Sequence, residues 1–466
     1  MPVILWTDAL IFLLLALVLS FGWYASRHEH LRAPWRQVGR SKTAMGALVV
    51  LGFYVLVGLL DSVHFHPQLD DSPADKPVYS GEVLSLFDLM AEPLRVQREK
   101  TYSAPLAIQL YAKETIEQVD GSTRRDYPRL VHAGEHLTDP AGHLSDVLLT
   151  ALRSISRGLL AWLALLLILT MISAYRQRDG IAAALRRLLT AGPGLPLYAA
   201  VWTLLLVFMV IGLMADLGTQ YHLLGTDKVG EDVLYQSLKS IRTGLMIGTL
   251  TTLVMLPAAV LLGLMAGYFK GRVDDVIQYI YTTLNAIPSV LLIAAAVLIL
   301  QIYMSNHADD FNSVTERADL RLLFLCIILG ITSWTGLCRL LRGESFKLRE
   351  LDYVQAAHAF GVRHFTVLYR HILPNVLHIV LIAVVLDFSG LVLAEAVLSY
   401  INIGVDPSMD SWGNMINGAR LELAREPVVW WSLMAAFLFM FTLVLAANLF
   451  SDVVRDAFDP RLRNTR

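Results

Sequence analysis

The sequence contains few charged residues. Only 17% of its 466 residues are Asp, Glu, Lys or Arg, and 55% are hydrophobic, which gives a mean hydropathy of +0.54. An ordinary soluble domain carries about 25% charged residues, so this composition is typical of a chain whose solvent is lipid. The net charge is −2, and no Lys/Arg stripe with interleaved aromatic residues is present. We therefore expect no nucleic-acid partner.

The sequence also lacks the short motifs of common enzyme classes. It has no Gly-x-x-x-x-Gly-Lys-Ser/Thr segment to hold nucleotide phosphates, no Gly-x-Ser-x-Gly elbow and no His-Glu-x-x-His pair. We expect no catalytic residue and no cofactor, and any ATP that powers this protein must be hydrolysed by another chain. The two cysteines, Cys326 and Cys338, are about 18 Å apart along one predicted helix. This separation excludes a disulfide between them.

Histidines provide a weak indication of a metal site. His64 and His66 are separated by one residue, His132 and His136 by one helical turn, and His143 follows. Such groups can bind a divalent metal. Solvated histidines on polar loops are far more common, so we expect no metal site and keep metal binding as an alternative.

Nine apolar runs are long enough to cross a bilayer, which requires about 20 residues in a helix. Pro288 lies inside one of these runs and predicts a kink or a local break there. The runs cover approximately residues 3–23, 44–60, 147–174, 197–217, 241–268, 276–303, 321–341, 374–398 and 428–450.

Arginines and lysines predict the orientation, because basic loops are retained on the cytoplasmic side. Segments 24–43 and 175–196 are strongly basic, whereas segment 61–146 holds nearly twice as many acidic as basic residues. We therefore expect an external N-terminus and, after nine spans, a cytoplasmic C-terminus. A basic block follows the first span and no positive charge precedes it, the reverse of a signal peptide, so we expect this span to be retained.

Glycine and proline between residues 192 and 196 break the helical pattern and divide the chain. Residues 1–60 provide two spans and a basic cytoplasmic loop, and residues 147–196 provide a third span and a basic cytoplasmic linker. Between them, residues 61–146 form an external segment, in which runs 80–91 and 105–119 predict a small helical domain. Residues 197–466 contain the remaining six spans.

The cytoplasmic loop at 342–373 carries the most informative pattern. Asp352 suits a helix N-cap, and Gln355 three residues later can reach back to it in a capping-box-like start. Gly361 can adopt the left-handed conformation that ends a helix. A second amphipathic turn precedes Pro374, which opens the next span. The pattern predicts a short, rigid helix that projects from the membrane.

This loop resembles the EAA loop of ABC-importer permeases. The resemblance rests on Tyr353, Gln355, Ala356, Ala357, Gly361 and the run His371–Asn375, which includes Leu373 and Pro374. Further fragments follow the order of the dipeptide/oligopeptide branch, and together they cover about 245 residues, 220–466. They are Leu224 with Gly225, Thr226 and Asp227, then Gly230 and Asp232, 266–268, Pro288, 394–399, Ser411 with Trp412 and Gly413, and 456–462.

The resemblance implies an all-α integral membrane protein with a six-helix core like that of type I importers. The apolar runs place a three-span extension before this core. The resemblance further implies a permease subunit of the inner membrane, surrounded by lipid, that forms half of a translocation path with a second homologous permease. Two cytoplasmic ABC ATPases would bind the loop through Asp352 and the loop residues just named. An external substrate-binding protein would deliver the cargo, with peptides first, and nickel or other small solutes as alternatives.

Two departures from the family pattern stand out. The family usually has Glu where this chain has Gln355, so a charge-assisted contact from that position is lost. The N-terminal 196 residues have no role that the resemblance assigns.

Two acidic residues lie in or near a span, where a buried carboxylate is costly and functional by default. Glu395 matches a family motif, and we expect it to make a structural hydrogen bond near the external end. Asp387 matches nothing recognised, so lining of the path and ordinary helix contact are both open.

Two other classes of function remain. A secondary transporter should show inverted repeats with interrupted helices, and none is visible. A membrane scaffold or sensor built on the external segment could keep a permease-like core without transporting.

Overall fold

The computed structural model describes residues 1–68, 79–117, 123–137, 139–178, 180–192, 195–307, 311 and 313–458. The chain divides into two compact units that do not follow chain order. Of the described residues, unit 1 contains those within 1–3, 35–243 and 410–450, and unit 2 contains those within 4–34, 244–409 and 451–458. Helix α9 (Val233–Phe269) begins in unit 1 and continues in unit 2.

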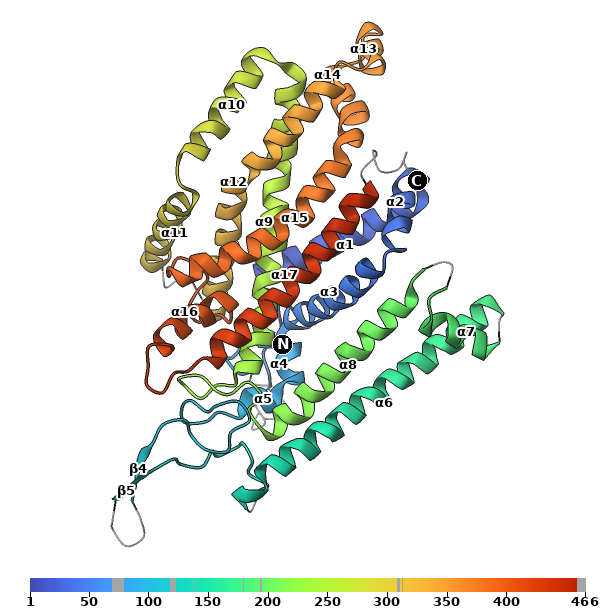
Figure 1. The fold of residues 1–466 in the computed structure, drawn as a ribbon. Coiled ribbons are helices and arrows are strands. Elements are labelled where there is room, and N and C mark those ends of the chain that lie inside the picture. The colour runs from blue at the N-terminus through green and yellow to red at the C-terminus, as the bar shows by residue number, and fades with distance from the viewer. Residues whose placement is uncertain are drawn as a thin grey trace, which may run out of the picture. The chain divides into compact units, whose positions relative to one another are not determined.

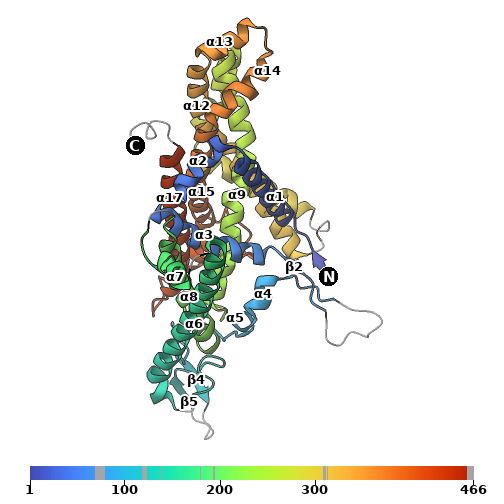
Figure 2. The same ribbon diagram turned by 90° about the vertical axis from the view of Figure 1, so that its right-hand side faces the viewer.

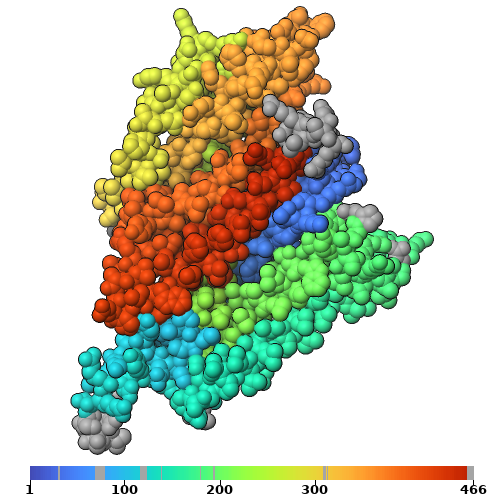
Figure 3. Space-filling model, in the orientation of Figure 1, coloured from blue at the N-terminus to red at the C-terminus, as the bar shows by residue number. Residues whose placement is uncertain are grey.

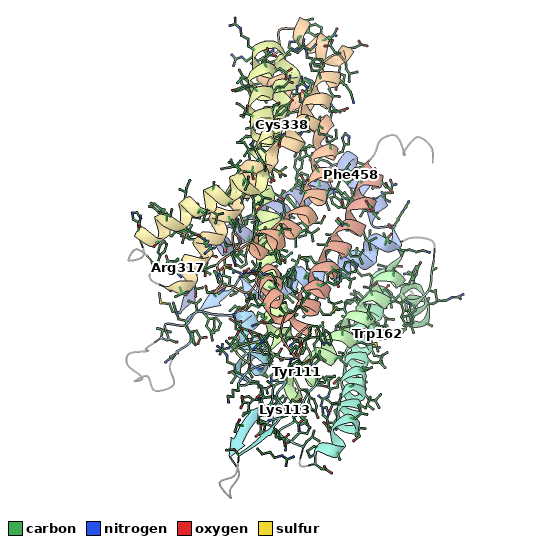
Figure 4. The ribbon with its side chains drawn as sticks, turned by 60° about the vertical axis from the view of Figure 1, so that its left-hand side comes forward. Tyr111, Lys113, Trp162, Arg317, Cys338 and Phe458 are labelled. Atoms are coloured by element: carbon green, nitrogen blue, oxygen red, sulfur yellow. The ribbon has the colours of Figure 1, made fainter. Side chains whose placement is uncertain are left out.

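The spans of unit 1 are α3 (Lys42–Asp61), α6 (His143–Gln177), α8 (Leu197–Gln220) and most of α17 (Trp431–Phe458). Helices α6 and α8 run side by side in both views (Figures 1 and 2). Glycine permits this contact, because a Cβ added to Gly158 would lie 2.6 Å from the carbonyl oxygen of Phe208. Trp162, labelled in Figure 4, donates from Nε1 to the carbonyl of Val201 at 3.0 Å.

The segment between α3 and α6 is only partly helical. It forms α4 (Leu86–Met90), α5 (Glu92–Val96), the antiparallel pair β4 (Glu114–Glu117) and β5 (Thr123–Asp126), and strands β2 (His64–Phe65) and β3 (Leu84–Ser85), which form a sheet with β1 (Pro2–Val3). Ser85 and Asp88 cap α4 reciprocally. The helix expected within 80–91 is therefore present, whereas the helix expected at 105–119 is wrong. The backbone groups of β4 are satisfied by antiparallel pairing with β5.

The spans of unit 2 are α1 (Trp6–Arg27), α11 (Ser289–Asn306), α12 (Val314–Leu348) and α15 (Leu373–Tyr400), together with the later part of α9. The N-terminal span packs on α12, where the backbone N–H of Thr7 donates to Asp319 at 3.1 Å and the Thr7 hydroxyl donates to the same carboxylate. Glycines of α9 allow close packing with α12, because a Cβ on Gly267 would lie 2.4 Å from the carbonyl oxygen of Arg342.

The described residues contain nine helices long and apolar enough to cross a membrane, as the sequence predicts. The span expected at 276–303 is present but begins later than predicted, at Ser289. The first half of the predicted run is the amphipathic helix α10 (Gly271–Ala286), and the apolar span begins only after Pro288, which caps α11. The predicted break at Pro288 is thus complete. The remaining helices are α2 (Glu29–Val38), α7 (Ile181–Leu189), α13 (Asp352–Ala359), α14 (His364–Val367) and α16 (Trp412–Glu422).

Candidate functional site: the loop between α12 and α15

The predicted short helix is α13, but its start differs from the expectation. Asp352 is the first helical residue rather than the cap, and Leu351 occupies the N-cap position without a side-chain hydrogen bond. Gln355 does not complete a capping box. Its amide Nε2 donates to the carbonyl of Glu350 at 3.2 Å. Gln355 therefore ties α13 to the end of α12, a contact that a glutamate at this position could not donate.

Gly361 ends α13 as predicted. Its φ is +73°, and the two hydrogen bonds of a Schellman motif are present: Gly361 N–H donates to His358 at 2.9 Å, and Val362 N–H donates to Ala357 at 3.1 Å. The chain then forms α14 and a π-helical turn at Leu368–Ile372 that leads directly into α15. Pro374 lies in the first turn of α15, directly after the π-helical turn.

One face of the loop is packed and the other is uncovered. Val354, Val367 and Ile372 are fully buried, in one cluster with Ala357 and residues of α9 and α12. The opposite face exposes large aromatic rings: Phe360 is 86% exposed, Phe365 72% and Tyr369 75%. Figure 3 shows the orange atoms of this segment at the surface. The sequence motif did not include these three rings, although an exposed aromatic residue is a recognised mark of an interface.

Of the predicted coupling residues, Ala357 alone is buried, and Leu373 is partly buried. Asp352, Tyr353, Gln355, Ala356, Gly361 and Pro374 are exposed. Asn375 Nδ2 lies 3.2 Å from the Tyr353 hydroxyl and links α13 to α15.

A tyrosine of α9 holds α13 and α14 together. The hydroxyl of Tyr268 lies 2.7 Å from His358 Nε2 and 2.9 Å from His364 Nδ1, and Arg349 donates to the Tyr268 carbonyl at 2.7 Å. A cavity of about 430 Å³ adjoins these side chains and Glu350. Lys270 donates to Glu350 at 2.8 Å and lowers the pKa of that carboxyl. These contacts bind the loop to two spans of unit 2.

An ion pair fixes the last turns of α12. Arg342 binds Asp274 of α10 through Nε to Oδ1 at 2.6 Å and Nη2 to Oδ2 at 2.7 Å. The hydrogen bonds from Arg342 lower the pKa of Asp274 despite some burial. Charge-assisted pairs of this parallel form are strong and directional.

The family-like segment Gly225, Thr226 and Asp227 lies in unit 1 and is structural. Thr226 is fully buried, and its hydroxyl donates to the Thr101 carbonyl at 2.9 Å while it accepts from the backbone N–H of Ser103 at 2.7 Å. Gly225 has φ of +73°, which glycine adopts without strain. Asp227 accepts from the N–H of Val229 and of Glu231. The segment therefore joins the extension to the core.

The second family-like segment, Ser411 to Gly413, also makes structural contacts in unit 1. Ser411 caps α16 by accepting from Asn414 N–H at 3.0 Å, and Trp412 donates from Nε1 to the Ser237 carbonyl at 3.0 Å. Trp412 and Gly413 are buried. The last fragment of the resemblance continues beyond the described residues at 459–462, and the helix break at 193–194 also lies outside them.

A buried charge cluster in unit 1 escaped the sequence prediction. His222 Nδ1 lies 2.7 Å from Asp232 Oδ2, and His222 Nε2 lies 3.6 Å from Glu99 Oε1. Burial disfavours the imidazolium, but the two carboxylates outweigh it and raise the pKa of His222 to about 9. Burial likewise opposes ionisation of Glu99, but His222 and the backbone N–H groups of 131–133 lower its pKa to about 2.

The acidic residues of α15 differ in their surroundings. Glu395 is 2% exposed and accepts a hydrogen bond from the Ser399 hydroxyl at 2.7 Å, a contact of the structural kind expected for it. Asp387 is half-buried and forms no hydrogen bond or ion pair with any residue that the structure describes. The candidate metal histidines make separate contacts, such as His143 Nε2 with the Leu106 carbonyl and His136 Nε2 with Asp146.

Comparison with known proteins places the loop in context. Residues 259–464 match the family model of the binding-protein-dependent transport system inner membrane component. A glutathione transport system permease protein of Pectobacterium atrosepticum is 33% identical over 245 residues, which cover 52% of this chain and 74% of the relative. The chain belongs to this permease family. Dipeptide and oligopeptide permease proteins of Bacillus subtilis and Mycobacterium bovis are 28% and 31% identical, over 52% and 53% of this chain and 69% and 78% of theirs.

The family membership confirms several predictions together. The chain is an all-α, multi-pass membrane permease subunit of an ABC importer, and it is not an enzyme. The matched region includes α13 and Gly361, whereas residues 1–196 lie outside it.

Proposed function

We propose that this permease forms half of the translocation path for peptides and that α13 couples the path to a cytoplasmic ATPase. Peptides are the favoured cargo because the relatives are described as permeases for glutathione, dipeptides and oligopeptides. A second homologous permease completes the path, two ABC ATPases drive it, and an external binding protein delivers the cargo. The bacterial inner membrane is the expected location.

The orientation follows from the distribution of charge. Basic segments 24–43 and 175–196 are cytoplasmic, which makes the N-terminus external and the loop at 342–373 cytoplasmic. Helix α12 has 35 residues and is therefore about 50 Å long, enough to cross the bilayer. Because its last turn leads into the cytoplasmic loop, its first turns lie at the external side.

The observation that carries the proposal is the contrast between the two faces of α13. Val354 and Ala357 anchor the helix to α9 and α12, and Tyr268 locks it to α14, so a force on α13 is transmitted to the spans. Asp352, Tyr353, Gln355 and Ala356 are exposed and accessible to the ATPase, together with the ring of Phe360. ATP-driven closure of the ATPases then rocks the spans of unit 2.

The extension has a supporting role in this scheme. Its residues 101–103 hold Thr226, and Tyr102 donates to Glu422 at the end of α16 at 3.2 Å. External loops around 220–240 and 400–425 are thereby ordered for contact with the binding protein. Asp387, without a partner in the described chain, lines the path or meets the second permease.

Reconstitution tests the proposal. The chain is co-expressed with its second permease and ATPases, purified as a complex and placed in vesicles with the binding protein. The proposal predicts that peptide-loaded binding protein stimulates ATP turnover and peptide uptake. A stable complex without stimulated turnover would favour a scaffold, and uptake without any ATPase would favour a secondary transporter.

A further inference from the structure

A polar cavity of about 280 Å³ lies between α11, α12 and the segment after α15, all in unit 2. Its lining residues are Gln301, Met304, Ser305, Arg317, Arg321 and Asp406. Arg317 and Arg321 are one turn apart on α12, so both guanidinium groups lie on the same face of that helix. Figure 4 labels Arg317 near the end of α12.

Arg321 is held in place, but not all of its hydrogen-bond donors have an acceptor. Its Nη1 lies 3.3 Å from Asp406 Oδ2 and its Nη2 lies 3.3 Å from the Gly404 carbonyl oxygen, both at the long end for such contacts. Its Nε is buried and has no hydrogen-bond partner among the described atoms. A buried donor without a partner is costly, and a ligand acceptor would remove this cost.

Asp406 does not neutralise the site. Its Oδ1 accepts from the backbone N–H of Ser408 at 3.0 Å and from the Ser408 hydroxyl at 2.7 Å. Burial opposes its ionisation, but these hydrogen bonds and the two arginines lower its pKa, so it carries one negative charge. The lining residues therefore carry two positive charges against one negative charge. Arg317 lines the cavity and is exposed, so its guanidinium group is accessible to an entering solute.

We propose that this cavity binds the free carboxylate of a small organic solute through Arg317 and Arg321. A guanidinium presents parallel donors that match the two oxygens of a carboxylate. Ser305 and Gln301 supply further donors, and the buried side chain of Met304 provides an apolar wall for the carbon next to the carboxylate. The volume suits an end group rather than a whole ligand of drug size.

This inference rests on the proposed function for its ligand, the C-terminal carboxylate of a peptide cargo. The first turns of α12 lie at the end of that helix opposite the coupling loop, so the cavity opens on the external side when the loop is cytoplasmic. A carboxylate site there would engage the cargo as it leaves the binding protein. It would also favour peptides with a free C-terminus over capped ones.

Thiol labelling tests the site in the full-length chain. Ser305→Cys introduces an exposed thiol in the cavity wall, while the native Cys326 and Cys338 are fully buried and stay unreactive. We expect a sulfonate-bearing methanethiosulfonate reagent to label this thiol faster than its trimethylammonium counterpart. Alanyl-alanine should slow labelling, whereas alanyl-alanine amide and sulfate should not. Asn306→Cys, next to the cavity but outside its lining, is the control whose labelling no ligand should change.

Adding Arg317→Gln to Ser305→Cys should shift the protection to about tenfold higher concentrations of alanyl-alanine, which corresponds to the loss of one charge-assisted hydrogen bond. Arg317 is exposed, so this change should leave the fold intact. Equal protection by the amide or by sulfate, or no protection by the free acid, would overturn the inference. If ATP-driven uptake were observed but alanyl-alanine gave no protection, only the carboxylate site would be rejected. If alanyl-alanine protected the thiol but no ATP-driven uptake occurred, only the proposed transport function would be rejected.

Discussion

Arg342 and Asp274 face each other through two parallel hydrogen bonds of 2.6 and 2.7 Å, which join α12 to α10 just before the loop that carries α13. The fork of a guanidinium holds α12 in one rotation about its axis. A lysine at the same position keeps the charge but provides only a point contact. The geometry of this pair, rather than its charge alone, therefore fixes the base of the loop.

The first prediction concerns this pair. We expect Arg342→Lys to destabilise the protein by about 1 kcal/mol, because the bidentate contact is lost, and to lower the ratio of peptide transported to ATP hydrolysed. The measurements are the thermal unfolding midpoint of the detergent-solubilised complex and that ratio in vesicles. Lys347→Ala is the matched control, because the Lys347–Glu344 pair is exposed and contributes little. Equal loss of coupling in both variants would contradict the prediction.

The second prediction concerns Gly361. A Cβ atom at this position would meet no atom within 4 Å, so a substitution causes no steric clash. Its only cost is the strain of a side-chain-bearing residue at a φ of +73°. Gly361→Val should cost roughly 1–2 kcal/mol locally, because a β-branched residue disfavours the left-handed region, and should uncouple ATP turnover from uptake. Gly361→Asn should retain most coupling, because asparagine tolerates this conformation. If both variants transport like the original protein, the conformation of Gly361 has no role in coupling.

Some of this site was readable from the sequence, and some was not. Gly361 as the stop of α13 and Pro288 as a helix break were predicted, because each depends on the local chemistry of one residue. The start of α13 was misplaced, since Asp352 is only one residue from the true cap and several residue types are tolerated there. Helix boundaries depend on the last hydrogen bond, which composition alone does not fix.

Long-range partners could not be predicted at all. Asp274 and Arg342 are 68 residues apart, and Glu99 lies in the extension while His222 lies in the core. Hydropathy fixes which segments enter the membrane but not their rotation or register. The strand pair β4–β5 was missed for a related reason, because a short polar strand becomes stable only through a partner distant from its own pattern.

The third prediction concerns pH. The folded pKa of His222 is about 9, above its ordinary value of 6.5, so its contribution to stability is complete below pH 6.5 and is lost as the pH rises toward 9. The pKa of Glu99 is about 2, below its ordinary value of 4.5, so its contribution is lost as the pH falls from 4.5 toward 2.

His222→Gln should therefore lower the unfolding midpoint at pH 6 and flatten its decline between pH 6.5 and 9. Thermal unfolding followed by tryptophan fluorescence measures both effects. His307→Gln, on an exposed helix end of unit 2, is the control and should leave the profile unchanged. If the unfolding midpoint of His222→Gln declined with pH in parallel with that of the original protein, the buried ion pairs of His222 would not be the cause of that decline.

The fourth prediction concerns helix packing. Gly267→Ala places a methyl group 2.4 Å from the carbonyl oxygen of Arg342, so α9 and α12 must separate. We expect a loss of roughly 1–3 kcal/mol, typical of overpacking, and reduced coupling. Gly390→Ala, which meets nothing within 4 Å, should be neutral or slightly stabilising because alanine favours a helix. The measurement is the thermal unfolding midpoint of each variant. Equal midpoints for the two variants would count against close packing at Gly267.

The most direct measurement of the central claim is photo-crosslinking from position 360. Phe360 is 86% exposed at the end of α13, so a photoreactive phenylalanine analogue fits there without disturbing the core. The account predicts a crosslink to the ATPase subunit in the assembled importer, and protection of a Phe360→Cys thiol from a membrane-impermeant reagent added outside intact cells. Labelling of that thiol from the outside, with no crosslink to the ATPase, would contradict it.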